Sequence, residues 1–274
     1  MDSVALLVTA EDIEAYRRDG AICLRGLFKP WLATIEAGIA RNMAEPGPYA
    51  SENLNPGEPG RFFDDYCNWE RIAEFRDVVL NSPAAAVAAA VMGSQSAQFF
   101  HDHVLVKEPG THRATPWHQD IPYYFTDGRQ TVSFWIPIDP VREATLRVVA
   151  GSHRWEKWVL PVKWLTDADF YAAGGDYLPV PDPDAEPGRY RVLEWPLEPG
   201  DAVLFDFRAL HGARGNPTAQ RRRALSLRFV GDDVTYGARP GRTSPPYPGH
   251  GMVPGQRLRE DWFPVVWRAS TPPR

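Results

Sequence analysis

The feature that most restricts the fold of this chain is a series of short segments, rich in β-branched and aromatic residues, that are separated by turns. These segments cover residues 98–107, 130–138, 145–149, 190–195, 201–207 and 223–230. The 274 residues include 27 prolines and 22 glycines, which favour turns over a helical bundle. Many short strands at close spacing are typical of an all-β barrel or sandwich. The sequence therefore predicts a mainly β fold.

The N-terminal third has helical patterns. Thr9 and Asp12 form a capping pattern for a helix over residues 9–19, which Gly20 can end, and residues 21–24 follow as a short strand. Apolar spacing predicts helices over residues 30–44 and about 69–92, the second broken near Pro83, with a loop over residues 46–60. We expect one domain over residues 1–274, with helices over about 9–93, a β core over about 94–235 and an irregular C-terminal tail.

Composition argues against several classes of protein. The formal net charge of −5 does not suit a nucleic-acid-binding surface. Two cysteines, Cys23 and Cys67, are too few for a disulfide framework. We see neither a signal peptide nor an apolar run approaching the roughly 18 residues of a membrane span. We therefore expect a cytoplasmic protein that binds neither nucleic acid nor membranes.

The residues most suggestive of chemistry are His118 and Asp120, within the segment Trp117-His118-Gln119-Asp120. On an extended strand these two side chains would point to the same face. His211 follows 93 residues later, where a strand meets a glycine-rich turn. Two imidazoles and one carboxylate form the facial triad of non-haem Fe(II) oxygenases. The pair His118-x-Asp120 is a weak signal alone, because such tripeptides arise often by chance.

Arg222 supports this interpretation. Residues 221–230 read as a strand entered through three arginines, and Arg222, Ala224, Ser226 and Arg228 share one face of it. A guanidinium group on an inner face can hold a carboxylate with two hydrogen bonds. A 2-oxoacid bound to iron requires such a group at its far end. The neighbouring arginines at 221 and 223 are expected to be solvated.

The chain resembles the phytanoyl-CoA dioxygenase family of Fe(II)/2-oxoglutarate-dependent oxygenases from about residue 107 to 229, and more loosely through the N-terminal helices. The motifs are Trp-His-Gln-Asp at 117–120, Leu-Arg-Val-Val-Ala-Gly-Ser-His at 146–153, Pro-Gly-Asp-Ala-Val-Leu-Phe at 199–205, His-Gly at 211–212 with Asn216, and Arg222 with Ala224 and Ser226. Together these motifs are specific, although each alone is not.

The resemblance implies a double-stranded β-helix core, that is, a cupin-like jelly roll. It implies His118, Asp120 and His211 as iron ligands and Arg222, eleven residues after His211, as the clamp on the 5-carboxylate of 2-oxoglutarate. Trp135 falls where the family often has an aromatic residue beside this co-substrate. The implied reaction consumes O2 and 2-oxoglutarate, releases succinate and CO2, and hydroxylates a small organic molecule.

Two positions depart from the family pattern. Ala150 stands where the family usually has proline, which changes a turn, and Ala213 replaces a frequent serine, which removes one hydroxyl contact to the co-substrate. Asp120 is retained, as in the hydroxylases of the family. In the halogenases this carboxylate is absent and chloride takes its place.

Further candidate residues lie around these positions. His101, His103, Leu105 and Lys107 share one face of a predicted strand, and Lys107 is a candidate for contact with the co-substrate. The candidates for the substrate pocket are His103, Tyr123, Tyr124 and Arg228.

Other functions stay open at this point. His101 and His103 with His118 form an alternative metal group, which would suit a cupin-type enzyme without a 2-oxoacid. A non-catalytic jelly-roll binding protein is a third possibility. Nothing indicates a CoA-binding site, and the substrate, the carbon attacked, the oligomeric state and the role of the tail are left open by the sequence.

Overall fold

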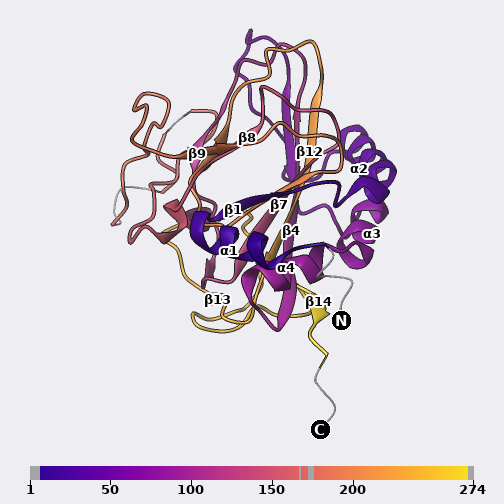
Figure 1. Cartoon of the computed structure of the whole chain (residues 1–274), viewed down its shortest axis with the longest axis vertical. Helices are drawn as coiled ribbons and strands as arrows, with labels where there is room; N and C mark the ends of the chain where they lie inside the picture. Colours follow the sequence, from indigo (N-terminus) through magenta and orange to yellow (C-terminus); the bar gives the residue numbers. More distant parts are fainter. Residues whose placement is uncertain (1–6, 167, 172–175, 271–274) are drawn as a thin grey trace.

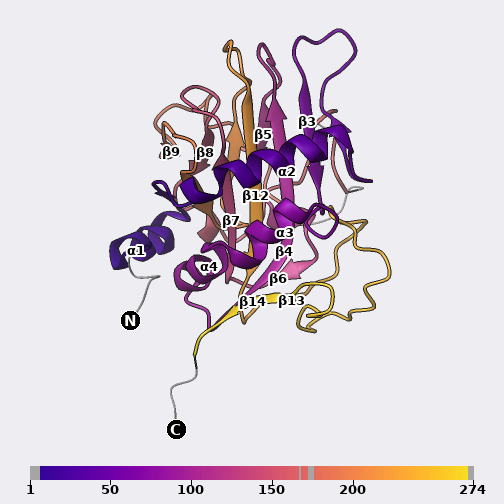
Figure 2. The ribbon, with the colours of Figure 1, turned by 90° about the vertical axis from the view of Figure 1, so that its right-hand side faces the viewer.

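The fold is described from a computed structural model that covers residues 7–166, 168–171 and 176–270. Two antiparallel β-sheets face each other, and helices cover the outer face of the larger one. Figure 1 shows α2 and α3 outside β12 and β4, with β8 and β9 on the opposite side of the molecule. Figure 2 looks onto the helices α2, α3 and α4, which lie over the large sheet. The predicted jelly-roll core is confirmed by this arrangement.

The helices occupy the N-terminal part of the chain, as predicted. They are α1 (Ala10–Asp19), α2 (Leu32–Ala44), α3 (Ala73–Asn81) and α4 (Ala84–Met92), with short 3₁₀ turns η2 (Lys29–Trp31), η3 (Ile121–Tyr123) and η4 (Ser152–Arg154). Thr9 and Asp12 form the reciprocal capping box at the start of α1, and Gly20 ends this helix with φ +80°. The region predicted as one broken helix is divided between α3 and α4 at Ser82 and Pro83, because proline cannot continue a helical hydrogen-bond ladder.

The large sheet contains most of the strands. Its order is β1 (Ala21–Leu24), β10 (Ala202–Phe205), β7 (Thr131–Pro137), β12 (Arg222–Val230), β4 (Ser96–Lys107), β3 (Phe62–Tyr66) and β2 (Ser51–Glu52), and β14 (Val265–Arg268) also pairs with β4. β4 and β12 form its centre, with Arg222 opposite Lys107 and Val230 opposite Gln98. This pairing aligns the inward faces of two long strands.

The small sheet brings the candidate histidines together. Its order is β5 (Thr115–His118), β11 (His211–Ala213), β8 (Leu146–Val149) and β9 (Val192–Glu194). A separate pair is formed by β13 (Thr235–Tyr236) and β6 (Thr126–Asp127). His211 does not end the strand that begins near residue 201, as the sequence suggested. It begins β11 in the opposite sheet, because the chain turns between Phe205 and His211.

The two faces of β12 have different roles. Leu225, Leu227 and Phe229 point outward into the main core, where they pack with apolar side chains of α2, α3 and α4. Ala224 packs in the separate cluster between the sheets, and Ser226 and Arg228 line cavities there. The alternation of residues along β12 therefore places one set of side chains in the core under the helices and the other set in the space between the two sheets.

Five short strands were not predicted: β2, β3 and β14 of the large sheet, and the separate pair β6 and β13. β2 lies within residues 46–60, which the sequence indicated as a loop, and β3 lies between two predicted helices. β14 lies in the C-terminal tail, whose sequence has no clear hydrophobic periodicity. β3 and β14 pair with the side of β4 that faces away from β12, and β2 pairs with β3, so these three strands extend one edge of the large sheet. Pairing with an existing edge stabilises such segments, although their own sequence pattern is weak.

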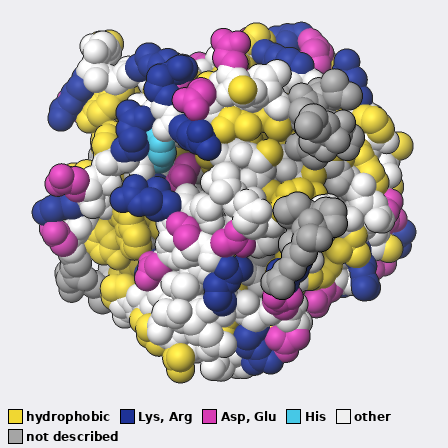
Figure 3. Space-filling view, turned by 60° about the horizontal axis from the view of Figure 1, so that its bottom comes forward, with side chains coloured by type: hydrophobic (Ala, Val, Ile, Leu, Met, Phe, Trp, Pro, Cys, Tyr) yellow, Lys and Arg dark blue, Asp and Glu magenta, His cyan; other side chains and the backbone are white. Residues whose placement is uncertain are grey.

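No single helix among the described residues is both long and apolar enough to cross a membrane. The pair α3 and α4 has the length and composition together, but the two helices are bent by 48°. Their apolar residues, including Phe75, Val79 and Val87, are buried in the main core. On the face drawn in Figure 3, acidic side chains lie among the basic ones instead of leaving one continuous basic surface.

The buried carboxyl group of Asp102 provides a prediction for stability. Its Oδ1 accepts hydrogen bonds from the backbone N–H groups of Asn68 (2.8 Å) and Trp69 (2.9 Å), while its Oδ2 has no hydrogen-bond partner among the residues that the structure covers. Burial raises the pKa of Asp102 to about 7. Because the folded-state pKa is raised, the contribution of this group to stability is fully present below about pH 4 and is lost as the pH rises towards 7.

We expect Asp102→Asn to remove this loss. The free energy of unfolding can be measured by urea denaturation. The difference between the variant and the wild type should increase in favour of the variant from pH 4 to pH 7, by up to about 4 kcal/mol. Asp77→Asn, at an exposed position of α3, is the control and should follow the wild type across this range. Parallel pH profiles for wild type and Asp102→Asn would contradict the prediction.

Candidate metal centre

His118 and His211 are direct neighbours in the small sheet. His118 is the last residue of β5, His211 is the first of β11, and the two form a cross-strand pair. Their ring centroids are 4.2 Å apart, and both side chains are buried. Residues separated by 92 others are thus brought together by strand pairing alone.

Asp120 joins them by a route that differs from the prediction. The chain leaves β5 after His118, and Asp120 has a helical backbone (φ −73°, ψ −38°) at the start of η3. The backbone N–H of Ile121 donates to the carbonyl oxygen of Phe207, which holds this turn. The expectation of a shared strand face is therefore wrong, although the convergence of the two side chains is correct.

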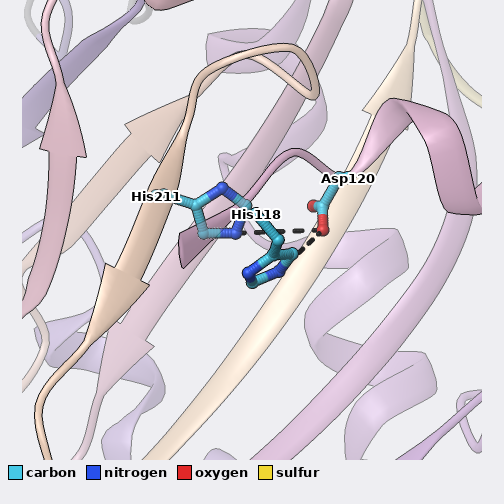
Figure 4. A group of neighbouring side chains, drawn as sticks. All are labelled: His118, Asp120 and His211. Carbon is cyan, nitrogen blue, oxygen red and sulfur yellow. Dashed lines mark ion pairs between the residues drawn. The ribbon is translucent and has the colours of Figure 1, made fainter. Parts of the chain in front are cut away.

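The three side chains point at one another (Figure 4). Oδ1 of Asp120 lies 3.7 Å from Nε2 of His118 and 3.8 Å from Nε2 of His211. One ligand atom from each residue lies within 4.8 Å of the other two. Across the described ranges, no other set of three His, Cys, Asp or Glu side chains forms such a group. This spacing leaves room for one ion between the three atoms.

Backbone contacts set the protonation of both imidazoles. Nδ1 of His118 lies 2.8 Å from the carbonyl oxygen of Pro116, and Nδ1 of His211 lies 2.9 Å from that of Ala209. A carbonyl oxygen can only accept, so each Nδ1 carries the proton and each Nε2 presents a lone pair. Burial and the adjacent His118 lower the pKa of His211 to about 3. The donor set of two imidazoles and a carboxylate fits a divalent transition metal.

Arg228 and Ser133 hold the other oxygen of Asp120. Nε of Arg228 and Oγ of Ser133 each donate to Oδ2 at 3.3 Å. Burial alone would raise the pKa of Asp120, but Arg228 and the two histidines outweigh it and keep this pKa well below its usual value. The sequence suggested Arg228 only as a pocket residue. Its position on the Arg222 face was the available signal for the contact with Asp120.

Arg222 lies in a narrow cavity beside the histidines. His118, His211, Trp135 and Ser226 also line this cavity. Nε and Nη2 of Arg222 are buried and have no hydrogen-bond partner within the described residues. The guanidinium carbon lies 5.4 Å from the centre of the Trp135 ring, and burial lowers the pKa of Arg222 to about 10. An unpaired buried cation of this kind is a receptor for an anion.

Lys107 is next to this cavity but does not line it. It is the cross-strand partner of Arg222, and its Nζ donates to the carbonyl oxygen of Arg214 at 3.1 Å. Nζ also lies 4.4 Å from the centre of the Phe62 ring. Burial and the charge of Arg222 hold the pKa of Lys107 well below its usual value. Its contact with a co-substrate stays a prediction.

A wider pocket of about 310 Å³ opens beside the metal ligands. His118 and Asp120 form part of its wall, and the predicted residues His103, Tyr123, Tyr124 and Arg228 all line it. Asp64, Tyr66 and Trp164 also line it and were missed by the sequence analysis. Trp164 lies in the irregular stretch after residue 154, so no period marked it, although its ring centroid is 5.1 Å from that of His118.

The alternative metal group is not formed. His103 donates from Nε2 to Oδ2 of Asp64 at 2.8 Å, and that carboxylate also accepts a hydrogen bond from Asn53. His101 places its Nδ1 3.1 Å from the carbonyl oxygen of Asp102. His103 is thus occupied by a carboxylate in the pocket wall, and the pair does not join His118.

Comparison with known proteins shows the family of this chain. A sequence model of the phytanoyl-CoA dioxygenase family (PhyH) matches residues 16–224. A probable phytanoyl-CoA dioxygenase of Caenorhabditis elegans is 24% identical over 227 residues, which are 78% of this chain and 65% of that protein. The dioxygenase lolE1 of Epichloe uncinata is 26% identical over 237 residues, 80% of this chain and 81% of the other. The chain thus spans about two thirds of the nematode relative.

Solved structures share the fold. The non-haem α-ketoglutarate-dependent carbocyclase SnoK from nogalamycin biosynthesis superposes with a TM-score of 0.74 at 22% identity, covering 97% of this chain and 100% of SnoK. EctD from S. alaskensis, solved with 2-oxoglutarate and 5-hydroxyectoine, has a TM-score of 0.66 at 18% identity, covering 96% and 86% of the two chains.

Proposed function

The chain belongs to the phytanoyl-CoA dioxygenase family, and we propose that it is a non-haem Fe(II)- and 2-oxoglutarate-dependent dioxygenase that hydroxylates a small organic molecule. Succinate and CO2 are the co-products. One observation carries the proposal: Nε2 of two histidines and one carboxylate oxygen converge beside a buried arginine whose Nε and Nη2 have no hydrogen-bond partner among the described residues. An iron ligand set and a co-substrate receptor therefore lie in one cavity.

His118, Asp120 and His211 would hold the iron, because their free donor atoms face a common point. When bound, Fe(II) supplies the activation of O2 that couples decarboxylation of 2-oxoglutarate to oxidation of a substrate C–H bond. The carbonyl oxygens of Pro116 and Ala209 keep both rings in the orientation and tautomer needed for binding. Arg228 and Ser133 engage Oδ2 of Asp120 and so direct Oδ1 towards the histidines.

Arg222 binds the far carboxylate of 2-oxoglutarate in this proposal. Its Nε and Nη2 lie on one edge of the guanidinium group, where two parallel hydrogen bonds to a carboxylate form. Trp135 packs beside this guanidinium and excludes water from it. The substrate would enter the wider pocket, whose wall includes His118 and Asp120 and places a substrate carbon next to the metal ligands.

The direct test is an anaerobic titration of the protein with Fe(II) and 2-oxoglutarate. We expect a weak visible charge-transfer band from the chelate at one equivalent of each, followed by succinate formation when O2 is admitted. The same titration with 2-oxoglutarate omitted is the control. Absence of both the band and the succinate would refute the proposal.

A further inference from the structure

Two buried polar atoms in the wider pocket have no hydrogen-bond partner among the described residues: Nε2 of His101 and Nη1 of Arg228. Both residues line this pocket, and both are at least nine-tenths buried, with 2% and 4% of their surface exposed. They are cross-strand partners at the centre of the large sheet, His101 on β4 and Arg228 on β12. Two neighbouring side chains that line the pocket thus carry hydrogen-bonding atoms without a partner among the described residues.

Nε2 of His101 is an acceptor. Nδ1 of this ring lies 3.1 Å from the carbonyl oxygen of Asp102, so Nδ1 carries the proton. Burial and the charge of Arg228 hold the pKa of His101 well below its usual value, which keeps the ring neutral. A neutral imidazole with a protonated Nδ1 leaves a lone pair on Nε2, and this lone pair requires a donor.

Nη1 of Arg228 is a donor. Nε of the same guanidinium is occupied by Asp120, and the guanidinium carbon lies 5.8 Å from the centre of the Tyr124 ring. Guanidinium nitrogens carry only N–H groups and cannot accept. Because its charge is already balanced by Asp120, this edge of Arg228 suits a neutral oxygen better than a second carboxylate.

One small group satisfies both atoms. A hydroxyl oxygen accepts from Arg228, and its hydrogen donates to His101, whereas a carboxylate cannot donate and an ammonium group cannot accept. Leaving both protein atoms unpaired would carry a desolvation cost for each. We propose that the substrate is a compact alcohol whose hydroxyl group is held between His101 and Arg228, beside Asp120. This inference rests on the proposed function, since it names the substrate class of that site.

The aromatic part of the pocket wall suits an apolar ring or chain. Tyr66 stacks on Tyr49 with ring centroids 4.9 Å apart, and Trp164 and Phe170 contribute further aromatic surface. His103, the other histidine in this wall, is already paired with Asp64. A volume of about 310 Å³ accommodates a small molecule but does not enclose a CoA thioester. The pocket therefore combines this aromatic surface with polar side chains, among them Ser51, Asn53 and Lys163.

The test uses four matched probes: benzyl alcohol, toluene, benzoate and benzylamine. Their affinities for the protein loaded with Zn(II) and 2-oxoglutarate can be ranked by ligand-observed saturation-transfer NMR, because Zn(II) is diamagnetic. We expect benzyl alcohol to bind most tightly of the four. In His101→Phe the preference for benzyl alcohol over toluene should fall about tenfold, as expected for losing one buried hydrogen bond.

His101→Gln is the matched variant, because its side-chain oxygen can accept in place of Nε2 and should retain most of the preference. Thermal unfolding of both variants checks that they are folded. Tightest binding of benzoate, equal binding of toluene and benzyl alcohol, or an unchanged preference in His101→Phe would overturn the inference. The chelate band is the separate readout: its absence in wild type refutes the proposed function, whereas its presence without an alcohol preference refutes only this inference.

Discussion

Arg222→Ala is expected to weaken 2-oxoglutarate binding by about 100- to 4,000-fold. Removing one partner of a buried, doubly hydrogen-bonded ion pair leaves the other charge uncompensated, which costs about 3–5 kcal/mol. The dissociation constant can be read from the anaerobic titration of the chelate band at fixed Fe(II). Arg222→Lys should recover part of the affinity, because an ammonium group keeps the charge and loses the two-point geometry.

Arg221 provides the matched control for this experiment. It is the preceding residue, is about half exposed and pairs with Glu108 at 2.7 Å. Arg221→Ala should leave the affinity for 2-oxoglutarate within about twofold of wild type, as expected for an exposed ion pair. If Arg222→Ala bound 2-oxoglutarate as tightly as wild type, Arg222 would not be the residue that binds its far carboxylate. The proposed metal site would be unaffected by this result.

The same position links function to stability. Arg222 is buried, and its Nε and Nη2 have no partner in the part of the chain that the structure describes, so we expect it to destabilise the folded protein in the absence of co-substrate. A hydrophobic residue of similar length, as in Arg222→Met, removes that cost. The midpoint of thermal unfolding of Arg222→Met should therefore lie above that of the wild type when 2-oxoglutarate is absent. Added 2-oxoglutarate should raise the midpoint of the wild type only.

His211→Ala is expected to abolish the chelate band and to reduce 2-oxoglutarate-dependent succinate formation by more than about 100-fold. Removing a residue that only hydrogen-bonds to a metal ligand already lowers metal affinity or activity by about 10- to 100-fold, and His211 is itself a proposed ligand. Fe(II) affinity, measured by anaerobic calorimetry, should fall in parallel. The remaining pair, His118 and Asp120, lacks the third atom of a facial set.

His112→Ala is the control for this variant, because His112 is exposed and lies outside the group of three. It should form the chelate with wild-type intensity and affinity. An undiminished band in His211→Ala would exclude this histidine as a ligand. In that case the proposed metal centre would have to be reassigned.

Local sequence patterns were sufficient for much of the fold. The capping box of Thr9 and Asp12, the break at Pro83 and the alternation along residues 222–230 each depend on neighbouring residues, and each was predicted. The edge strands β2, β3 and β14 were missed, because their pairing is stabilised by β3 and β4 rather than by their own composition. Asp120 was placed on a strand, because the hydrogen bond of Ile121 to Phe207 cannot be seen in the sequence.

The sequence by itself determined the residue types at the centre, since His118, Asp120, His211 and Arg222 were found from their spacing and their resemblance to a family. Only the tertiary structure decided how these residues work together. Contacts such as Arg228 with Asp120, His103 with Asp64, and His101 opposite Arg228 join segments that lie far apart in the chain or on different strands. Hydrogen-bond partners and burial, which set the free atoms of the pocket, depend on such non-local packing. For that reason the chemistry of oxygen activation could be predicted from the sequence, whereas the proposed pairing of His101 and Arg228 at a substrate hydroxyl could not.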